Sequence, residues 1–86
     1  MTSESTATAV RQFVLKNFPL ARRQRVTDDA SLLESGIVDS TGVLELVGFI
    51  QTEFDVTVSD EELLPENFES ISRMATFVER KKSGSR

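Results

Sequence analysis

The chain has 86 residues, of which 38% are hydrophobic and 28% charged, and its formal net charge is −4. It contains no cysteine and no histidine, so disulfides, thiolate metal ligands and the most common general base are excluded. No stretch approaches the roughly 18 apolar residues of a membrane-spanning helix, and the N-terminus lacks the features of a secretion signal. We expect a single cytoplasmic domain over residues 1–86, monomeric, ordered from about residue 5 to 82 and flexible at both ends.

Acidic residues are concentrated in the middle of the chain. Between Val26 and Ser72 there is no Lys or Arg, and this range holds twelve Asp and Glu. The simplest explanation is a solubilising surface. An acidic surface also repels nucleic acid and favours basic protein partners, so neither nucleic acid nor a membrane is expected as a partner. The acids do not have the spacing of a calcium loop, and no metal site is predicted.

The first predicted helix spans about residues 5–18. Its apolar face at helical spacing consists of Val10, Phe13, Val14 and Phe18. Pro19 is predicted to end it, because proline disfavours helical geometry in the preceding residue.

A long connection follows, over residues 20–39. It is too apolar for a loose linker, so we expect it to pack across the core through Leu32, Leu33, Ile37 and Val38. Asp28 or Ser31 could cap a short helical turn within it, and Gly36 permits a turn with positive φ.

The second predicted helix spans Ser40–Phe54. Its buried stripe consists of Val43, Leu46, Val47, Ile50 and Phe54. Gly42 and Gly48 lie inside it, where each glycine costs about 1 kcal/mol relative to alanine. We interpret both glycines as candidates for close packing or docking.

Two further helices complete the predicted fold. A short third helix begins after Ser59 and ends near Pro65, and a last helix begins after Ser70. The inner face of the last helix consists of Ile71, Met74, Ala75 and Val78. The pattern predicts an all-α fold, a small four-helix bundle of three longer helices and one short helix, with a long first loop. The predicted core consists of Phe13, Val14, Leu33, Val43, Leu46, Val47, Ile50, Phe54, Ile71, Met74 and Val78.

Ser40 is the main candidate functional residue, because it stands where a turn becomes a helix. It could cap that helix, act as a nucleophile, or accept a modification. Catalysis by Ser40 is disfavoured because the chain offers no obvious base to activate it. A phosphate at this position would meet free N–H groups and the positive end of the helix dipole. The local physics alone does not choose between a cap and a modified serine.

Four short motifs occur in the segment Leu32–Ile71: a Gly36-x-x-Asp39-Ser40 turn, a Leu46-Val47 pair, Glu53-Phe54 and the later Pro65-Glu66-Asn67-Phe68. In these motifs the segment resembles acyl and peptidyl carrier proteins, and with the flanking helices the resemblance extends over about residues 5–82. It implies that Ser40 receives a phosphopantetheine arm whose thiol carries an acyl or aminoacyl thioester. The protein would then be a non-catalytic carrier, since the reactive thiol belongs to the cofactor.

The resemblance also implies partners and a surface that they recognise. The expected partners are a phosphopantetheinyl transferase, an adenylating or other acyl-loading enzyme, and downstream synthases or tailoring enzymes. We expect recognition through Asp39, Thr41, Glu45 and Glu53.

The sequence departs from fatty-acid-type carriers. Thr41 replaces the leucine that often follows the serine, and Gly42, Gln51 and Thr52 stand where acids are frequent. We interpret this as a free-standing carrier of secondary metabolism with an aminoacyl or short acyl cargo. A carrier for fatty-acid synthesis remains an alternative, as does a small acidic helical adaptor that only binds proteins.

Overall fold

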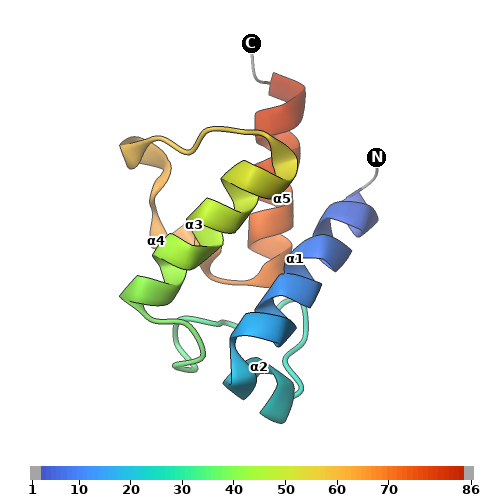
Figure 1. Ribbon diagram of the computed structural model, residues 1–86, viewed down its shortest axis with the longest axis vertical. Coiled ribbons are helices and arrows are strands. Elements are labelled where there is room, and N and C mark those ends of the chain that lie inside the picture. Colours follow the sequence, from blue (N-terminus) through green and yellow to red (C-terminus); the bar gives the residue numbers. More distant parts are fainter. Residues whose placement is uncertain (1–2, 85–86) are drawn as a thin grey trace.

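The structure is a computed structural model that describes residues 3–84. These residues form five α-helices and one 3-10 helix, in the order α1 (Ser3–Asn17), α2 (Pro19–Arg23), α3 (Ser40–Phe54), η1 (Asp60–Glu62), α4 (Pro65–Phe68) and α5 (Ile71–Gly84). Figure 1 shows α3 in front of α4 and α5, with α1 beside α5 and α2 at the end opposite the two termini. The predicted all-α class is confirmed.

The core lies between α3 on one side and α1, α4 and α5 on the other. It includes six predicted positions that are completely buried, namely Val14, Leu46, Ile50, Ile71, Met74 and Val78. The predicted Phe13, Leu33, Val43, Val47 and Phe54 are partly buried and pack against this core. Phe68 and Phe77 were not predicted but are among the most buried side chains, and their ring centroids are 5.6 Å apart.

Aromatic rings connect α1 to α3. The rings of Phe13 and Phe49 are stacked with their centroids 4.2 Å apart. Phe54 meets Phe49 edge-on at 5.9 Å, and Phe18 meets Phe13 in the same manner at 6.3 Å. Aromatic pairs of this geometry contribute about 0.5–1.5 kcal/mol beyond their buried area, so this cluster fixes α3 against α1.

The first helix ends at Asn17, and Phe18 before Pro19 is extended, so the predicted end at Pro19 is confirmed. Both Pro19 and Pro65 also begin helices, which was not predicted. Pro19 is the first residue of α2 and Pro65 the first residue of α4. The missing N–H of proline costs nothing at the first helical position, where no intrahelical acceptor exists. The predicted third helix has the correct start, because η1 begins at Asp60 directly after Ser59, but it does not continue to Pro65 as a single element. It is replaced by η1, which ends at Glu62, and by the separate helix α4.

The remaining helix boundaries are close to the predicted ones. α3 has the predicted bounds, and the Ser70 hydroxyl accepts a hydrogen bond from the Arg73 N–H at 3.1 Å, so Ser70 caps α5 as expected. α5 continues to Gly84, two residues beyond the expected end of order. Residues 1–2 and 85–86, where flexible ends were expected, lie outside the described residues.

Candidate functional site

Asp39, and not Ser40, caps the N-terminus of α3. Asp39 has extended backbone angles (φ −106°, ψ −169°), and its carboxylate accepts a hydrogen bond from the Gly42 N–H at 2.8 Å. Ser40 is the first residue of the helix, so the interpretation of Ser40 as the cap is wrong. The Ser40 side chain is exposed, and its hydroxyl has no hydrogen-bond partner among the described residues. It is therefore accessible from the surface.

The loop before Ser40 is fixed against the start of α5. The N–H of Leu32 donates to the carbonyl of Glu69 at 2.6 Å, and the N–H of Ser72 donates to the carbonyl of Asp28 at 2.9 Å. Gly36 adopts the expected positive φ of 82°, which turns the chain back toward the helix. The Ser31 hydroxyl accepts a hydrogen bond from the Glu34 N–H at 3.0 Å. Of the two residues predicted as a possible cap of this turn, Asp28 and Ser31, it is therefore Ser31 that caps it.

Gly42 allows a close approach between α3 and the end of α1. A Cβ at this position would lie 2.9 Å from the ring of Phe18 and 2.9 Å from a methyl group of Val38. This explains why a glycine is placed in the first turn of α3. Gly48 is different, because nothing lies within 4 Å of the corresponding Cβ position, so its interpretation as a packing glycine is wrong.

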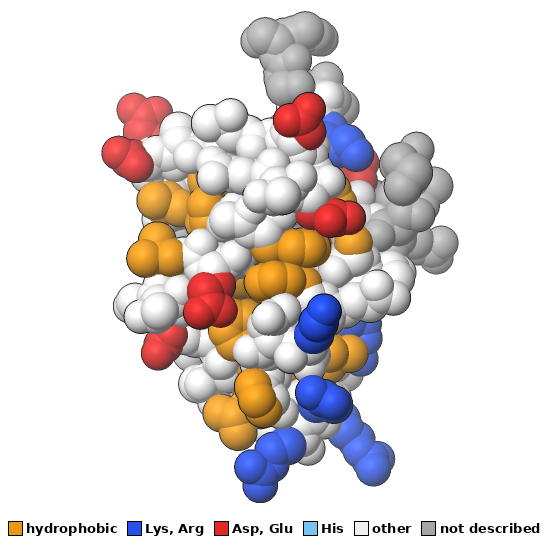
Figure 2. All heavy atoms as spheres, viewed as in Figure 1, with side chains coloured by type: hydrophobic (Ala, Val, Ile, Leu, Met, Phe, Trp, Pro, Cys, Tyr) orange, Lys and Arg blue, Asp and Glu red, His pale blue; other side chains and the backbone are white. Residues whose placement is uncertain are grey.

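A shallow apolar groove of about 500 Å³ opens beside Ser40. It is lined by Leu33, Val38, Asp39, Ser40, Val43, Leu44, Leu63, Leu64 and Pro65. Three of these side chains are unusually exposed for leucine, with exposed fractions of 64% for Leu44, 44% for Leu64 and 37% for Leu63. In Figure 2, hydrophobic side chains lie between acidic ones on the side of α3 and η1.

These leucines were not predicted as part of the site. Leu44 could have been found, because it falls outside the buried stripe of its own helix and yet is apolar. Leu63 and Leu64 follow the short helix η1, and their position beside Ser40 depends on tertiary structure that a local pattern does not contain.

The four predicted recognition residues are exposed but do not form one cluster. Asp39 and Thr41 flank Ser40, and Glu45 lies about one turn further along α3. Glu53 is near the other end of the helix, about 20 Å from Ser40 along the axis. It lines a separate groove together with Ala9, Gln12, Phe13, Lys16 and Phe49.

The described residues contain no group of three acidic, His or Cys side chains that could hold a metal ion. Within the same range, no helix is long and apolar enough to cross a membrane.

The fold and the site define a small helical bundle that presents an exposed serine at the N-terminus of a helix. The family model for the phosphopantetheine attachment site matches residues 9–78, and the chain belongs to this family. Members of the family hold phosphopantetheine as a covalently attached group, and the chain is a carrier protein of this kind.

Several relatives are named as acyl carrier proteins. The chain is 27% identical over 73 residues to an acyl carrier protein homolog of Mycoplasmopsis pulmonis, which covers 85% of this chain and 96% of the relative. It is 28% identical over 60 residues to an acyl carrier protein of Buchnera aphidicola, and this match covers 70% of this chain and 72% of the relative. A match of 52 residues to the probable acyl carrier protein PigG of a Serratia species is 36% identical and covers 60% of each chain.

The residues around Ser40 fit the phosphopantetheine group. Its hydroxyl is exposed and without a partner in the described chain, and the helix is already capped by Asp39. A phosphodiester on Ser40 would lie at the positive end of the α3 dipole, where negative charge is favoured. The groove beside it offers apolar surface to the arm.

Proposed function

We propose that Ser40 is the attachment site of the arm, and that the protein delivers an acyl or aminoacyl group, held as a thioester on the arm, to partner enzymes. The observation that carries this proposal is the free, exposed hydroxyl of Ser40 beside a cap that Asp39 supplies, within the segment matched by the family model. A serine needed as the helix cap would not be available for modification.

Attachment requires a second enzyme, because the chain has no histidine and the Asp39 carboxylate beside Ser40 is engaged by the Gly42 N–H. The Ser40 oxygen attacks the pyrophosphate of coenzyme A, a new P–O bond forms, and the nucleotide half of coenzyme A leaves with the other phosphate. The hydroxyl proton passes to a base of the transferase. The carrier itself performs no catalysis, and the thiol that later bears the cargo is supplied by the arm.

Partner enzymes are proposed to dock on the surface around Ser40. Asp39, Thr41 and Glu45 contribute the polar part, and exposed Leu44 contributes apolar surface next to them. Glu53 would contact only a partner that extends along the whole of α3. The proposed partners are the transferase, an adenylating or acyl-loading enzyme, and downstream synthases or tailoring enzymes of the cytoplasm.

A role in secondary metabolism with a small cargo is proposed on two grounds. Near the end of α3, exposed Thr52 and partly buried Gln51, whose side-chain oxygen accepts the Val58 N–H at 2.9 Å, stand in place of the acids frequent in fatty-acid-type carriers. The groove beside Ser40 is a surface feature, whereas the centre of the bundle is filled by side chains that are fully buried. An aminoacyl or short acyl group on a solvent-exposed arm needs no space inside the bundle.

The proposal is tested by incubating the apo-protein with coenzyme A and a promiscuous phosphopantetheinyl transferase. Mass spectrometry should show the addition of one arm, and Ser40→Ala should abolish it. Ser35→Ala is a matched control, because Ser35 is also exposed in this region and its hydroxyl already donates to the Leu32 carbonyl at 3.3 Å. If the wild type gains no mass, or if Ser40→Ala still gains it, the attachment site is wrong, and the adaptor function returns to first place.

A further inference from the structure

The far wall of the groove beside Ser40 is formed by a segment with little regular structure. Leu63, Leu64 and Pro65 line the groove opposite Val43 and Leu44 of α3. Only the three residues of η1 and the four of α4 are helical between α3 and α5. Leu63 and Leu64 remain 37% and 44% exposed, so the apolar area that they bury stabilises the position of this wall only weakly.

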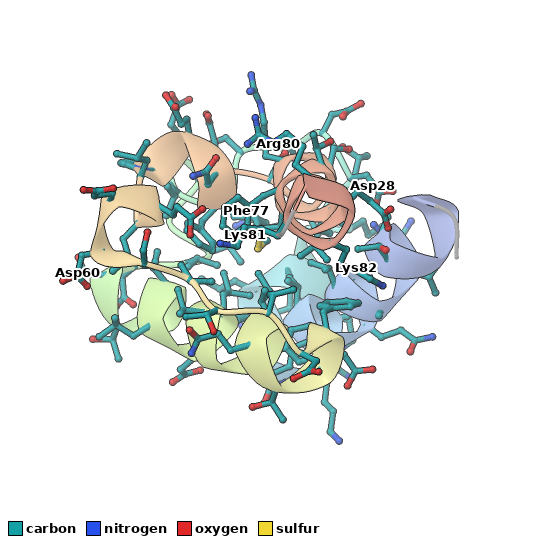
Figure 3. All side chains as sticks on the ribbon, turned by 90° about the horizontal axis from the view of Figure 1, so that it is seen from above. Asp28, Asp60, Phe77, Arg80, Lys81 and Lys82 are labelled. Atoms are coloured by element: carbon teal, nitrogen blue, oxygen red, sulfur yellow. The ribbon has the colours of Figure 1, made fainter. Side chains whose placement is uncertain are left out.

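Glu62, directly before this wall, is the point at which the segment is held. Its carboxylate accepts two hydrogen bonds from Lys81 Nζ of α5, at 2.8 Å and 3.0 Å. It also accepts the Ser59 N–H at 3.0 Å, and the carbonyl of Glu62 accepts a hydrogen bond from the Asn67 side chain at 2.9 Å. In Figure 3, Lys81 extends from α5 toward the side of η1, whereas Arg80 points away from it.

The ion pair between Lys81 and Glu62 is better shielded from water than the pair between Arg11 and Asp28. The side chains of Lys81 and Glu62 are 23% and 31% exposed, against 38% and 47% for Arg11 and Asp28. Partial burial reduces screening, and bidentate contact fixes the direction of the Glu62 side chain. The next residue on α5, Lys82, lies 5.8 Å from the centre of the Phe54 ring. The two adjacent lysines of α5 thus contact Phe54, at the end of α3, and Glu62, directly before the wall.

We propose that Glu62 and Lys81 are positioning residues: their ion pair fastens the wall formed by Leu63 and Leu64 beside Ser40, and so sets the shape of the surface on which the transferase docks. Neither residue lines the groove or touches the attachment serine. Their role is exerted through the wall. The docking part of this inference rests on the proposed function of Ser40, whereas the fastening of the wall does not.

The first experiment tests whether the ion pair fixes the positions of Leu63 and Leu64, in the full-length apo-protein without any partner. Methyl NMR spectra are compared for Lys81→Met, Glu62→Gln and the double variant. Glu62→Gln keeps a side-chain oxygen for the Ser59 N–H but removes the charge. We expect the methyl signals of Leu63 and Leu64 to shift and those of the buried Leu32 and Leu46 to stay. The double variant should shift them no further than either single variant, since both singles remove the same interaction.

Neighbouring residues supply matched controls with the same change of charge. Arg80 and Glu61 are exposed, and neither forms an ion pair with any residue in the described part of the chain. Arg80→Met and Glu61→Gln should leave the Leu63 and Leu64 signals in place, and Lys81→Arg should preserve the wild-type positions. If Arg80→Met moves these signals as much as Lys81→Met does, or if Lys81→Arg fails to preserve them, the ion pair does not fasten the wall.

The second experiment measures phosphopantetheinyl transfer by the same transferase as above. Relative to their charge-matched controls, Lys81→Met and Glu62→Gln should raise KM for the carrier by roughly two- to fivefold, the range of a partly exposed ion pair, with kcat unchanged. An unchanged KM together with shifted methyl signals overturns the docking role. Failure of the wild type to be modified overturns the function of Ser40 instead, and the methyl comparison still decides whether the wall is fastened.

Discussion

The ring of Phe18 packs against the backbone of Gly42, so that a Cβ on the glycine would lie 2.9 Å from the ring atom Cε1. Phe18 stands between α1 and α2, and Gly42 is in the first turn of α3. This contact places the end of α1 beside the first turn of α3, which begins at Ser40. Gly42 is therefore a packing glycine, whereas nothing lies within 4 Å of the Cβ position of Gly48, the other glycine of α3.

Gly42→Ala and Gly48→Ala should therefore change stability in opposite directions. At Gly42, overpacking against Phe18 and Val38 costs about 1–3 kcal/mol, which outweighs the gain in helix propensity of at most about 1 kcal/mol. At Gly48 the added methyl group meets nothing, so the free energy of unfolding should rise by about 0.5–1 kcal/mol. Urea denaturation followed by circular dichroism measures both. If Gly42→Ala raises the free energy of unfolding instead, the Phe18 ring moves aside without loss of stability, and the close packing at Gly42 is not what disfavours a side chain there.

Leu44 and Leu46 lie two residues apart on α3 and should respond differently to truncation. Leu46 is fully buried, and Leu46→Ala should cost roughly 2–5 kcal/mol. Leu44 is 64% exposed, and Leu44→Ala should change the free energy of unfolding by less than about 0.5 kcal/mol. If Leu44 contributes to docking as proposed, Leu44→Ala should still slow phosphopantetheinyl transfer. Wild-type transfer kinetics for this variant would remove Leu44 from the docking surface.

Much of this arrangement could be predicted from the sequence, because α3 and α5 each carry a long apolar stripe. The predicted starts of these two helices are also correct, since Ser70 caps α5 and a turn at Gly36 precedes α3. The cap of α3 could not be assigned, because Asp and Ser are both good caps and stand side by side. The extended backbone of Asp39 and the hydrogen bond that it accepts from the Gly42 N–H show that Asp39 is the cap.

The short elements were predicted less well, for a physical reason. Helices α2 and α4 have five and four residues, too few to show a helical period. Proline restricts the residue before it, and this restriction is compatible both with the end of one helix and with the start of the next. The contact between Glu62 and Lys81 joins residues far apart in the chain, so no local pattern could have indicated it.

The ion pair of Glu62 should make stability depend on pH. The Lys81 ammonium, with help from the Ser59 N–H, holds the pKa of Glu62 below its usual value of 4.5. The folded state thus binds this proton more weakly than the unfolded state, and the resulting stabilisation is present above pH 4.5 and lost as the pH falls through the lowered pKa. Thermal unfolding of the wild type and Glu62→Gln should differ near pH 7 and converge in acid. A constant difference across the titration would contradict this.

Charge on α3 should govern the rate at which the carrier meets its transferase. Glu45→Lys should slow transfer without altering the melting temperature, because exposed charge mainly affects encounter. The effect should shrink as salt rises, since the Debye length falls from about 10 Å at 0.1 M to about 3 Å at 1 M. Asp29→Lys makes the same change of charge in a different groove, beside Arg73, and should slow transfer less. Equal slowing by both variants would indicate an effect of net charge alone.

The nature of the cargo should be visible in the response of the bundle to acyl chains of increasing length. A chain that enters the core would add about 0.8 kcal/mol of stability for each CH₂ that it buries. A cargo on an exposed arm would add none, because the groove beside Ser40 is shallow and the side chains behind it, such as Leu46 and Ile50, are fully buried. We expect nearly constant melting temperatures across holo-proteins loaded with short to long acyl groups, and unshifted amide signals for Leu46 and Ile50. A melting temperature that climbs with chain length, together with shifts in these core amides, would show that the bundle opens to sequester the chain. In that case fatty acyl groups, and not short or aminoacyl groups, are its natural load.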